Sequence, residues 1–509
     1  MLRPTLASIA ALLVCDAAVA GAQDVPQRAD TTRRLPAVVV TATRDSIAPL
    51  ASPLPTSALT AAELRREHGV SLAQTLTRLP GVRSLSTGEQ VGKPVIRGLS
   101  GARVLVLDDG MRLEDFSWSD EDGPSVDARL AERVEVIRGP ASVLYGSDAL
   151  GGVVNAIPAA IPDARVAGAF RRGQLELYGA SNNREAGGVL GLEGARGRYG
   201  ARVAFVGRVG QDVHTPAGEI HNTGFLAGNG EAALGIHHTG GAESTLRLAH
   251  YGGEFKLLET DAPPGGTTAD EGGPARVTLD DRVQLAHRRR LGGFDVEARG
   301  QFQRHLLQEK ADNPNPVPGE PKEATVFDLL LNTASVDLLA HHGPAEGALR
   351  GTVGVSGLVQ RNDSRGIVPL VPDASIASGG AFAFERLAVG SRLALLAGVR
   401  GDARHLTADA DPRLALGDQS RSYTAATGDV GAVYRLAPSL ALAVNAGRAW
   451  RAPTLFELFA NGPRLGEGRY EYGDSTLKPE RSFNLDASLR WDSPRAHAEV
   501  ATFHTAVSD

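Results

Sequence analysis

The segment 483–491, "FNLDASLRW", constrains the fold most, because its side chains alternate between apolar and polar without a break. Leu485 and Leu489 fall on one face of an extended strand, and Asp486 and Arg490 fall on the other. Strands of transmembrane β-barrels alternate in this way, with apolar side chains toward lipid and polar side chains toward the lumen. A soluble β-sandwich or solenoid alternates too, so the connections between strands must decide between these folds.

The connections between the strands favour the barrel. From Gly173 onward, about fifteen candidate strands follow one another, joined alternately by short turns such as "HTGG" and "LGGFD" and by long loops such as "GQDVHTPAGEIHNTG" and "EKADNPNPVPGEPK". Outer-membrane barrels have short turns in the periplasm and long loops outside. Glycine is abundant, at 60 of 509 residues, and no apolar run reaches the roughly 18 residues of a membrane-spanning helix. We therefore predict a transmembrane antiparallel β-barrel over residues 166–509.

Residues 1–22 are typical of a secretory signal peptide. Arg3 gives a positive start, a short apolar run follows, and small residues precede a cleavage site near Ala22. Cleavage there would remove Cys15, the single cysteine, so the mature chain would have neither disulfides nor thiolate chemistry. We expect an exported protein, and its net charge of −6 is too small to suggest a nucleic-acid partner.

Residues 50–165 predict a compact α+β domain. Thr60 and Glu63 fit a capping box, and Ser71 begins a second short helix. Short apolar strands follow in "VIRG", "RVLVLDDG", "RVEVIRG" and "GGVVNAI". Arg97 and Arg138 each end one of these strands, and a buried arginine must be paired. We therefore expect both arginines to meet carboxylates.

Five segments together carry a family resemblance. They are "VVVTATR", "TLTRLPGV", "PVIRGLSGARVLVLDDG", "AERVEVIRGPASVLYGSDALGGVVN" and the downstream "WRAPTLFELFANG" with "GDSTLKPERSFNLDASLRW". In this order the chain resembles TonB-dependent outer-membrane receptors, nearest to the branch for zinc, haem and metal chelates. The resemblance implies an α+β plug domain inside a 22-stranded barrel. It also implies a monomeric protein in the Gram-negative outer membrane, in contact with its lipid, that imports scarce nutrients with energy from the inner-membrane proton gradient.

The segment Leu35–Arg44 resembles the TonB box, and it lies in a periplasmic tether over residues 23–49. Strand addition takes its affinity from backbone hydrogen bonds, which suits a short β-branched segment without a partner strand of its own. The expected partner is the C-terminal domain of TonB, which belongs to the inner-membrane complex. About a dozen mature residues precede the box, so we expect transport without an extra N-terminal signalling domain. The expected TonB-binding residues are Leu35, Pro36, Ala37, Val38, Val39, Val40, Thr41 and Ala42.

By the same resemblance, Arg97 and Arg138 should face carboxylates of the barrel wall. Such a layer of ion pairs would hold the plug in the barrel at rest and would break when a force acts on the plug. The resemblance also places "LEDFSWSDEDGPSVD", residues 113–127, on the outward side of the plug. Its acidic side chains would attract cations and repel a bare anionic chelate, although an ordinary solvated acidic loop has the same composition.

Several residues are candidates for substrate contact. Relatives in the zinc branch often have histidine near the positions of Asp122 and Arg464, so haem, a ferric chelate and zinc all stay open. His305 falls near the outer end of a strand, where a histidine cluster could bind a metal or haem. His237 and His238 fall at a predicted short turn and are expected to be solvated. The substrate candidates are Asp115, Trp118, Asp120, Glu121, Asp122, Tyr470 and Tyr472, and the weak metal candidates are His214, His221 and His250.

Other function classes fit less well. A passive porin would lack both the plug and the TonB box, and neither G-x-S-x-G nor H-E-x-x-H occurs, so we expect no enzyme and no cofactor. The expected cargo is a metal or metal chelate, such as an iron siderophore, haem or zinc. Cobalamin or another organic nutrient is the alternative. A fifteenth rising strand at Asp509 would end outside, so we expect a C-terminally truncated barrel that lacks about seven strands of the family's 22 and the terminal aromatic residue.

Overall fold

The structure is a computed structural model that describes residues 44, 48–86, 91–115, 123–258, 273–312, 323–344, 347–464, 469–493 and 496–508. The chain divides into units 1–37 and 38–509, and every described residue lies in the second unit. Among the described residues, no helix has both the length and the apolar character needed to cross a membrane.

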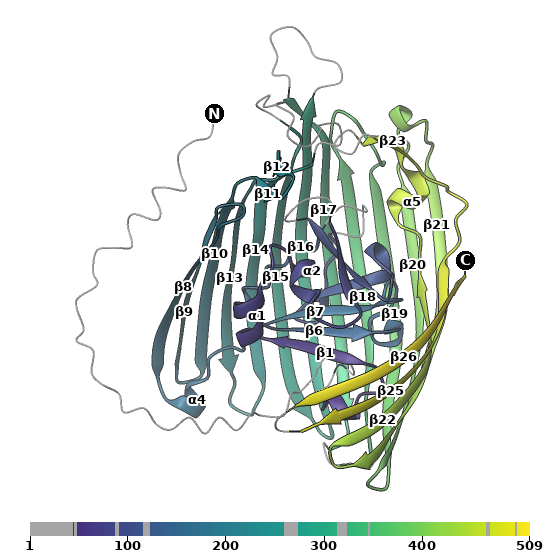
Figure 1. Ribbon diagram of the computed structural model, residues 1–509. Helices are drawn as coiled ribbons and strands as arrows, with labels where there is room; N and C mark the ends of the chain where they lie inside the picture. Colours follow the sequence, from purple (N-terminus) through teal and green to yellow (C-terminus); the bar gives the residue numbers. More distant parts are fainter. Residues whose placement is uncertain are drawn as a thin grey trace, which may run out of the picture. The chain divides into compact units, whose positions relative to one another are not determined.

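A 15-stranded sheet, here called the barrel sheet, dominates the fold (Figure 1). Each strand pairs antiparallel with its neighbour in chain order, which confirms the predicted antiparallel architecture of about fifteen strands. The strands are β8 (Phe170–Ala180), β9 (Glu185–Arg196), β10 (Tyr199–Gly210), β13 (Phe225–His237), β14 (Glu243–Lys256), β15 (Ala275–Leu291), β16 (Phe294–Asp312), β17 (Glu323–His342), β18 (Leu349–Ser364), β19 (Ala374–Val389), β20 (Leu393–Ala408), β21 (Gln419–Ala437), β22 (Leu440–Arg451), β25 (Glu480–Asp492) and β26 (His497–Ser508).

The two faces of the barrel sheet have the polarity that the alternation predicts. On β25, Phe483 and Leu485 are 45% and 46% exposed, whereas Asn484 and Asp486 are 1% and 5% exposed. Apolar side chains outside and polar side chains inside reverse the pattern of a soluble protein. Such a strand is stable only where lipid covers the apolar face, which is the arrangement of a membrane barrel.

The long connections between strands lie at one end of the barrel sheet. In an antiparallel sheet every second connection lies at the same end, and here long and short connections alternate along the chain. Between β10 and β13 lies the hairpin of β11 (Val213–Thr215) and β12 (Gly218–Ile220), and the 3-10 helix η3 (Pro412–Leu414) lies between β20 and β21. Between β22 and β25 lie α5 (Leu455–Phe459), β23 (Asn461–Arg464) and β24 (Arg469–Tyr472). Short turns join the strands at the other end, as at Gly292, whose φ of 59° suits glycine (Figure 1).

The plug domain contains a five-stranded sheet in the order β1-β6-β7-β4-β5, in which β4 and β7 are parallel. Thr60 and Glu63 form the predicted capping box, and Ser71 Oγ accepts a hydrogen bond from Gln74 N at 3.2 Å. Its elements are η1 (Pro49–Ala51), β1 (Thr56–Thr60), α1 (Ala61–Glu67), α2 (Leu72–Leu76), β2 (Val82–Ser86), β3 (Gly92–Ile96), η2 (Gly101–Arg103), β4 (Val104–Asp108), β5 (Met111–Arg112), β6 (Ala131–Arg138), α3 (Ser142–Tyr145) and β7 (Gly152–Pro158), and α4 (Ala164–Ala167) precedes β8.

Two apolar clusters hold the plug domain. One lies within the plug and joins α1 and α2 to the plug sheet, with Leu64, Leu76 and Val106 at its centre. The other is shared, because α3 packs against β19–β22 and its Leu144 lies in the same cluster as Phe384 of the barrel sheet. The plug therefore packs against the buried face of the barrel sheet through apolar as well as polar contacts.

Candidate functional site

Ion pairs join the plug to the barrel sheet, and Arg97 makes one of them. Arg97 follows β3 with a φ of 54°, in the left-handed region that few side chains adopt without support. Its Nη2 lies 2.5 Å from Asp486 Oδ1 on β25, and its guanidinium lies 4.2 Å from the ring centroid of Phe503 on β26. Both charged side chains are at most 5% exposed. The pair therefore fixes the strained turn at the end of β3 to the barrel sheet.

Arg138 makes a second link at the end of β6. Its Nη2 lies 2.5 Å from Glu499 Oε2 on β26 and donates to Ser57 Oγ at 3.1 Å, while Nη1 donates to the Pro80 carbonyl at 3.1 Å. Glu499 also accepts from Arg490 Nε at 2.9 Å. The sequence thus indicated that both arginines need carboxylates, and the structure supplies one to each from the barrel sheet.

Asp108 carries a third link that sequence reasoning missed. It ends β4, and its Oδ2 lies 2.7 Å from Arg247 Nη1 and 3.4 Å from Arg282 Nη1. Burial alone would raise the pKa of the Asp108 carboxyl, but the guanidinium groups of Arg247 and Arg282 outweigh burial and lower that pKa. An acid at the end of the apolar run "VLVLD" was the available signal. Arg103 adds a further link, with Nε 2.9 Å from Glu480 Oε2.

Arg44, the last residue of the segment that is predicted to be a TonB box, also contacts both the plug and the barrel sheet. Its Nη1 lies 2.6 Å from Asp337 Oδ2 on β17, and its guanidinium lies 4.5 Å from the ring centroid of Tyr145. The residues Leu35–Ala42 themselves lie outside the described residues. The prediction of a TonB box at these residues therefore stays a prediction, and the structure shows only the contacts of Arg44.

The acidic plug segment is only partly described. Trp118, Asp120, Glu121 and Asp122 lie outside the described residues, whereas Asp115 is 1% exposed. Its Oδ2 accepts a hydrogen bond from Ser125 N at 2.7 Å. Burial raises the pKa of the Asp115 carboxyl to about 6, although nearby His305 opposes that shift. Asp115 is thus a buried interface residue rather than a side chain of a solvated loop.

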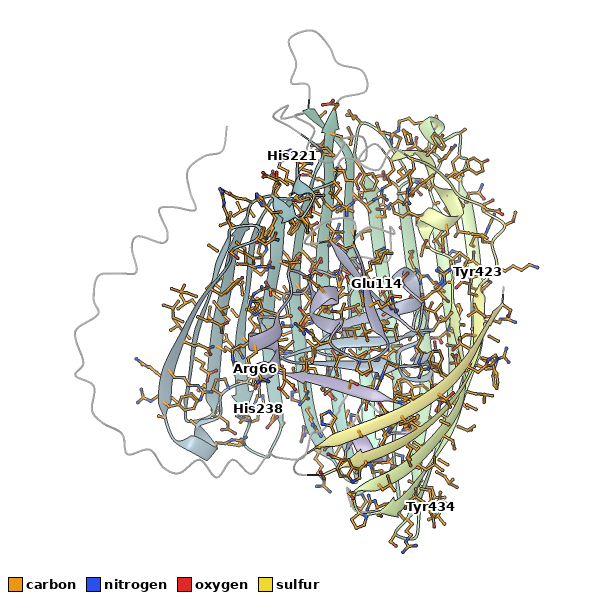
Figure 2. All side chains as sticks on the ribbon, in the orientation of Figure 1. Arg66, Glu114, His221, His238, Tyr423 and Tyr434 are labelled. Atoms are coloured by element: carbon orange, nitrogen blue, oxygen red, sulfur yellow. The ribbon has the colours of Figure 1, made fainter. Side chains whose placement is uncertain are left out.

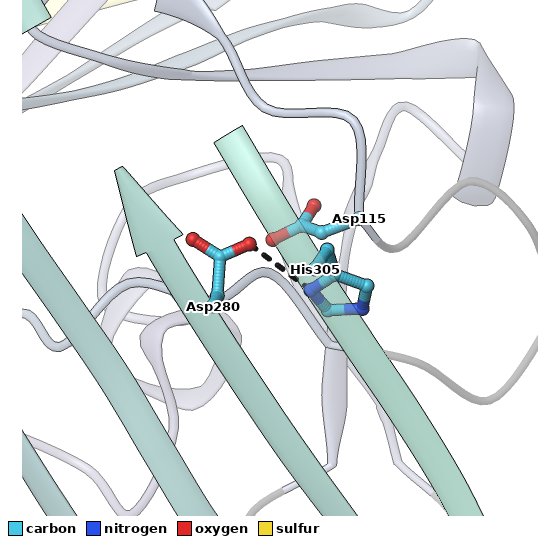
Figure 3. A group of neighbouring side chains, drawn as sticks. All are labelled: Asp115, Asp280 and His305. Carbon is cyan, nitrogen blue, oxygen red and sulfur yellow. Dashed lines mark hydrogen bonds and ion pairs between the residues drawn. The ribbon is translucent and has the colours of Figure 1, made fainter. Parts of the chain in front are cut away.

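Asp115 meets two barrel residues. Asp280 on β15 and His305 on β16 are 0% and 3% exposed, and one ligand-type atom from each of the three side chains lies within 4.8 Å of the others. Figure 3 shows the three side chains converging from the plug and from two adjacent strands. His305 Nδ1 donates to Asp280 Oδ2 at 3.0 Å. Of the three, Asp280 was not among the candidates from sequence, although the alternation in "TLDDRVQL" turns it inward.

The weak histidine candidates occupy two different settings. His214 and His221 belong to the connection with the β11–β12 hairpin, where His214 Nε2 lies 3.6 Å from Glu219 Oε2 and His221 groups with Asp212 and Glu219. His250 on β14 is half exposed and lies 2.7 Å from Asp281. Figure 2 places His221 toward the end of the long connections and His238 toward the opposite end, as the predicted turn position of His238 requires.

Tyr470 and Tyr472 project from β24 among the long connections. They are 63% and 83% exposed, and the Tyr470 hydroxyl donates to Asn461 Oδ1 at 2.8 Å. Exposed aromatic rings at this end of the sheet are free to stack on a planar ligand. Neither ring touches the Asp115 group in any contact that the described residues make.

The space between plug and barrel sheet at Arg112 is small. A cavity of about 60 Å³ lies there, and its lining includes Glu114, Tyr145, Arg400 and Trp450. Ligand pockets are usually about 300 Å³ or larger, so this cavity is too small for a metal chelate.

Comparison with known proteins gives consistent matches. The TonB-dependent receptor plug domain model matches residues 48–153, and the TonB-dependent receptor-like β-barrel model matches residues 194–509. The vitamin B12 transporter BtuB of Photobacterium profundum is 29% identical over 211 residues, which are 41% of this chain and 34% of that protein. The aligned part thus spans about a third of that relative.

Solved structures show the same fold. The copper transporter OprC superposes with a TM-score of 0.73 at 19% identity, covering 90% of this chain and 71% of that one. The ferric yersiniabactin uptake receptor FyuA from Yersinia pestis gives a TM-score of 0.67 at 17% identity, with 90% and 72% covered. At these identities the likeness concerns the fold.

Proposed function

Because this chain belongs to the TonB-dependent receptors, we propose that it imports a scarce nutrient across the Gram-negative outer membrane, with a metal or metal chelate as the favoured cargo. An iron siderophore, haem and zinc are the cargo classes. The observation that carries the proposal is the plug held against the barrel sheet by buried ion pairs from Arg97, Arg138 and Asp108. A passive pore would not contain such a plug, because the plug would block diffusion through the barrel.

The structure supports a route by which force reaches the plug. In the proposal, TonB adds a strand to Leu35–Ala42 and pulls from the periplasm. Arg44 follows the box and contacts both Asp337 and Tyr145, so the pull acts first on a contact between plug and barrel sheet. Buried ion pairs contribute little net stability compared with apolar packing, yet they fix one geometry. They therefore suit a plug that must hold its place and still be displaced.

A second cargo class has an observation in its favour. The curated relative reported above is a vitamin B12 transporter, so cobalamin or another organic nutrient is the alternative within the same family. Tyr470 and Tyr472 would serve either class, because exposed rings can stack on a corrin or a haem. In both versions the protein acts as a monomeric transporter surrounded by outer-membrane lipid and performs no catalysis.

Deletion of Leu35–Ala42 tests the proposal. Cells that produce the protein are supplied separately with labelled zinc, haem, a ferric siderophore and cobalamin, and uptake is measured. Uptake of one nutrient should stop, while binding of that nutrient to the cells persists. Deletion of the eight residues 23–30 is the matched control and should leave uptake intact. Uptake that continues without the box would show a passive pore and refute the proposal.

A further inference from the structure

Asp115, Asp280 and His305 form a buried group that the ion-pair layer does not account for. Asp115 comes from the plug, whereas Asp280 and His305 come from adjacent strands of the barrel sheet, so the group spans the interface (Figure 3). Two carboxylates at 0–1% exposure need compensation, since an uncompensated buried charge is strongly destabilising.

Existing contacts compensate Asp280 but only partly compensate Asp115. Asp280 Oδ1 lies 3.2 Å from Arg282 Nε, and its Oδ2 accepts from Gln303 Nε2 at 2.7 Å. Arg282 also lies 3.4 Å from Asp108, so its charge is already shared. Asp115 Oδ2 accepts one backbone hydrogen bond from Ser125, and its Oδ1 has no hydrogen-bond partner among the described residues. Asp115 therefore brings a buried carboxylate oxygen without a hydrogen-bond partner to a position beside Asp280 and His305.

We propose that Asp115, Asp280 and His305 bind one bare divalent transition-metal ion, of the Zn²⁺ class, between the plug and the barrel sheet. One imidazole and two carboxylates suit Zn²⁺, Mn²⁺ or Fe²⁺, and the absence of sulfur in the set disfavours Cu⁺. Tetrahedral Zn²⁺ needs ligand atoms about 3.4 Å apart at bond lengths near 2.1 Å. Asp280 Oδ2 and His305 Nδ1 already lie 3.0 Å apart, and all the ligand atoms lie within 4.8 Å. Shifts of about 1 Å by the side chains complete the set.

Neighbouring groups orient these ligands, as around known metal sites. Gln303 donates to Asp280 and accepts at 3.1 Å from the backbone N–H of Glu114, beside Asp115. The group of Asp212, Glu219 and His221 contrasts with this arrangement. Both oxygens of Asp212 already accept backbone hydrogen bonds, from Asn222, Thr223 and Gly224. That carboxylate is a loop cap, so His221 provides a matched control.

This inference rests on the proposed function and narrows its cargo to a bare metal ion. A group with 0–3% exposure is closed to a siderophore or haem, so only a single ion is compatible with it. Since the ligands belong to two domains, displacement of the plug would separate Asp115 from Asp280 and His305. The ion would then lose a ligand and be released in step with the pull.

The test measures binding of Zn²⁺ alone to the purified full chain in detergent, by competition with a fluorescent chelator. We expect one ion per chain, at least tenfold weaker binding after Asp115→Asn or His305→Ala, and unchanged binding after His221→Ala. Binding that is insensitive to the first two variants, that depends on His221, or that is absent from the unaltered chain would overturn the proposal.

If a variant fails to fold, zinc X-ray absorption spectroscopy of the unaltered chain tests the metal site instead. One imidazole with oxygen ligands supports the site, and any other imidazole count refutes it. Cellular uptake separates this inference from the proposed function. If uptake of a nutrient depends on the box but the chain binds no Zn²⁺, the metal site is refuted and the proposed import function is not. If the chain binds Zn²⁺ but uptake does not depend on the box, the proposed import function is refuted and the metal site is supported.

Discussion

Replacing Asp108 with asparagine should loosen the plug, because the change removes the charge at the centre of an interface contact and keeps its size. Asp108 faces Arg247 at 2.7 Å and Arg282 at 3.4 Å, with 3% of its side chain exposed. Loss of one partner from a buried ion pair costs about 3–5 kcal/mol. Arg247 keeps Glu231 at 3.0 Å, so the lower end applies, about 3 kcal/mol.

Hydrogen exchange of the plug amides measures this cost. A loss of about 3 kcal/mol should lower the protection of slowly exchanging amides in β4 and β7 by about a hundredfold. The matched control is Asp295→Asn, since Asp295 makes an exposed pair with Arg288 at 2.9 Å and should leave protection unchanged.

A double-mutant cycle isolates the ion pair itself. Adding Arg247→Met to Asp108→Asn removes the second charge, and the two effects should not add, because both variants lose the same ion pair. Protection within threefold of the unaltered chain after Asp108→Asn would refute the reasoning. So would strictly additive effects of the two substitutions.

Three further predictions follow from the same interface. The lowered pKa of Asp108 means that its contribution is present above the unfolded pKa of about 4 and is lost as pH falls further. The difference in plug protection between the unaltered chain and Asp108→Asn should therefore hold from pH 7 to about 4 and shrink below it, as hydrogen exchange at graded pH will show. Arg97→Ala should weaken plug docking by about 3 kcal/mol and reduce uptake, and unchanged plug protection and transport would contradict the role of its ion pair. Gly152→Ala should disrupt the plug sheet and lower the melting temperature in a heat-denaturation assay, since the added methyl would overlap the Ile137 carbonyl. Gly228→Ala places its methyl in open space and should leave the melting temperature unchanged.

The sequence alone determined the elements of the fold and their polarity. Alternation with a period of two is local, so "FNLDASLRW" predicted both a strand and which of its faces is apolar, and β25 agrees. Capping is local as well, since Thr60 and Glu63 interact across three residues. The chemistry of single side chains also indicated that Arg97 and Arg138 need carboxylates.

Only the tertiary structure decided which residues meet. Asp108 and Arg247 lie 139 residues apart, and nothing near either of them in the chain specifies the other. The composition of the acidic plug segment suggested a solvated loop as readily as a cation path, and burial against β15 and β16 turned Asp115 into an interface residue beside His305. Such meetings depend on strand register and on docking of the plug. Both are set by the packing of the whole chain, so a local pattern predicts that a charge needs a partner, and only the assembled fold supplies it.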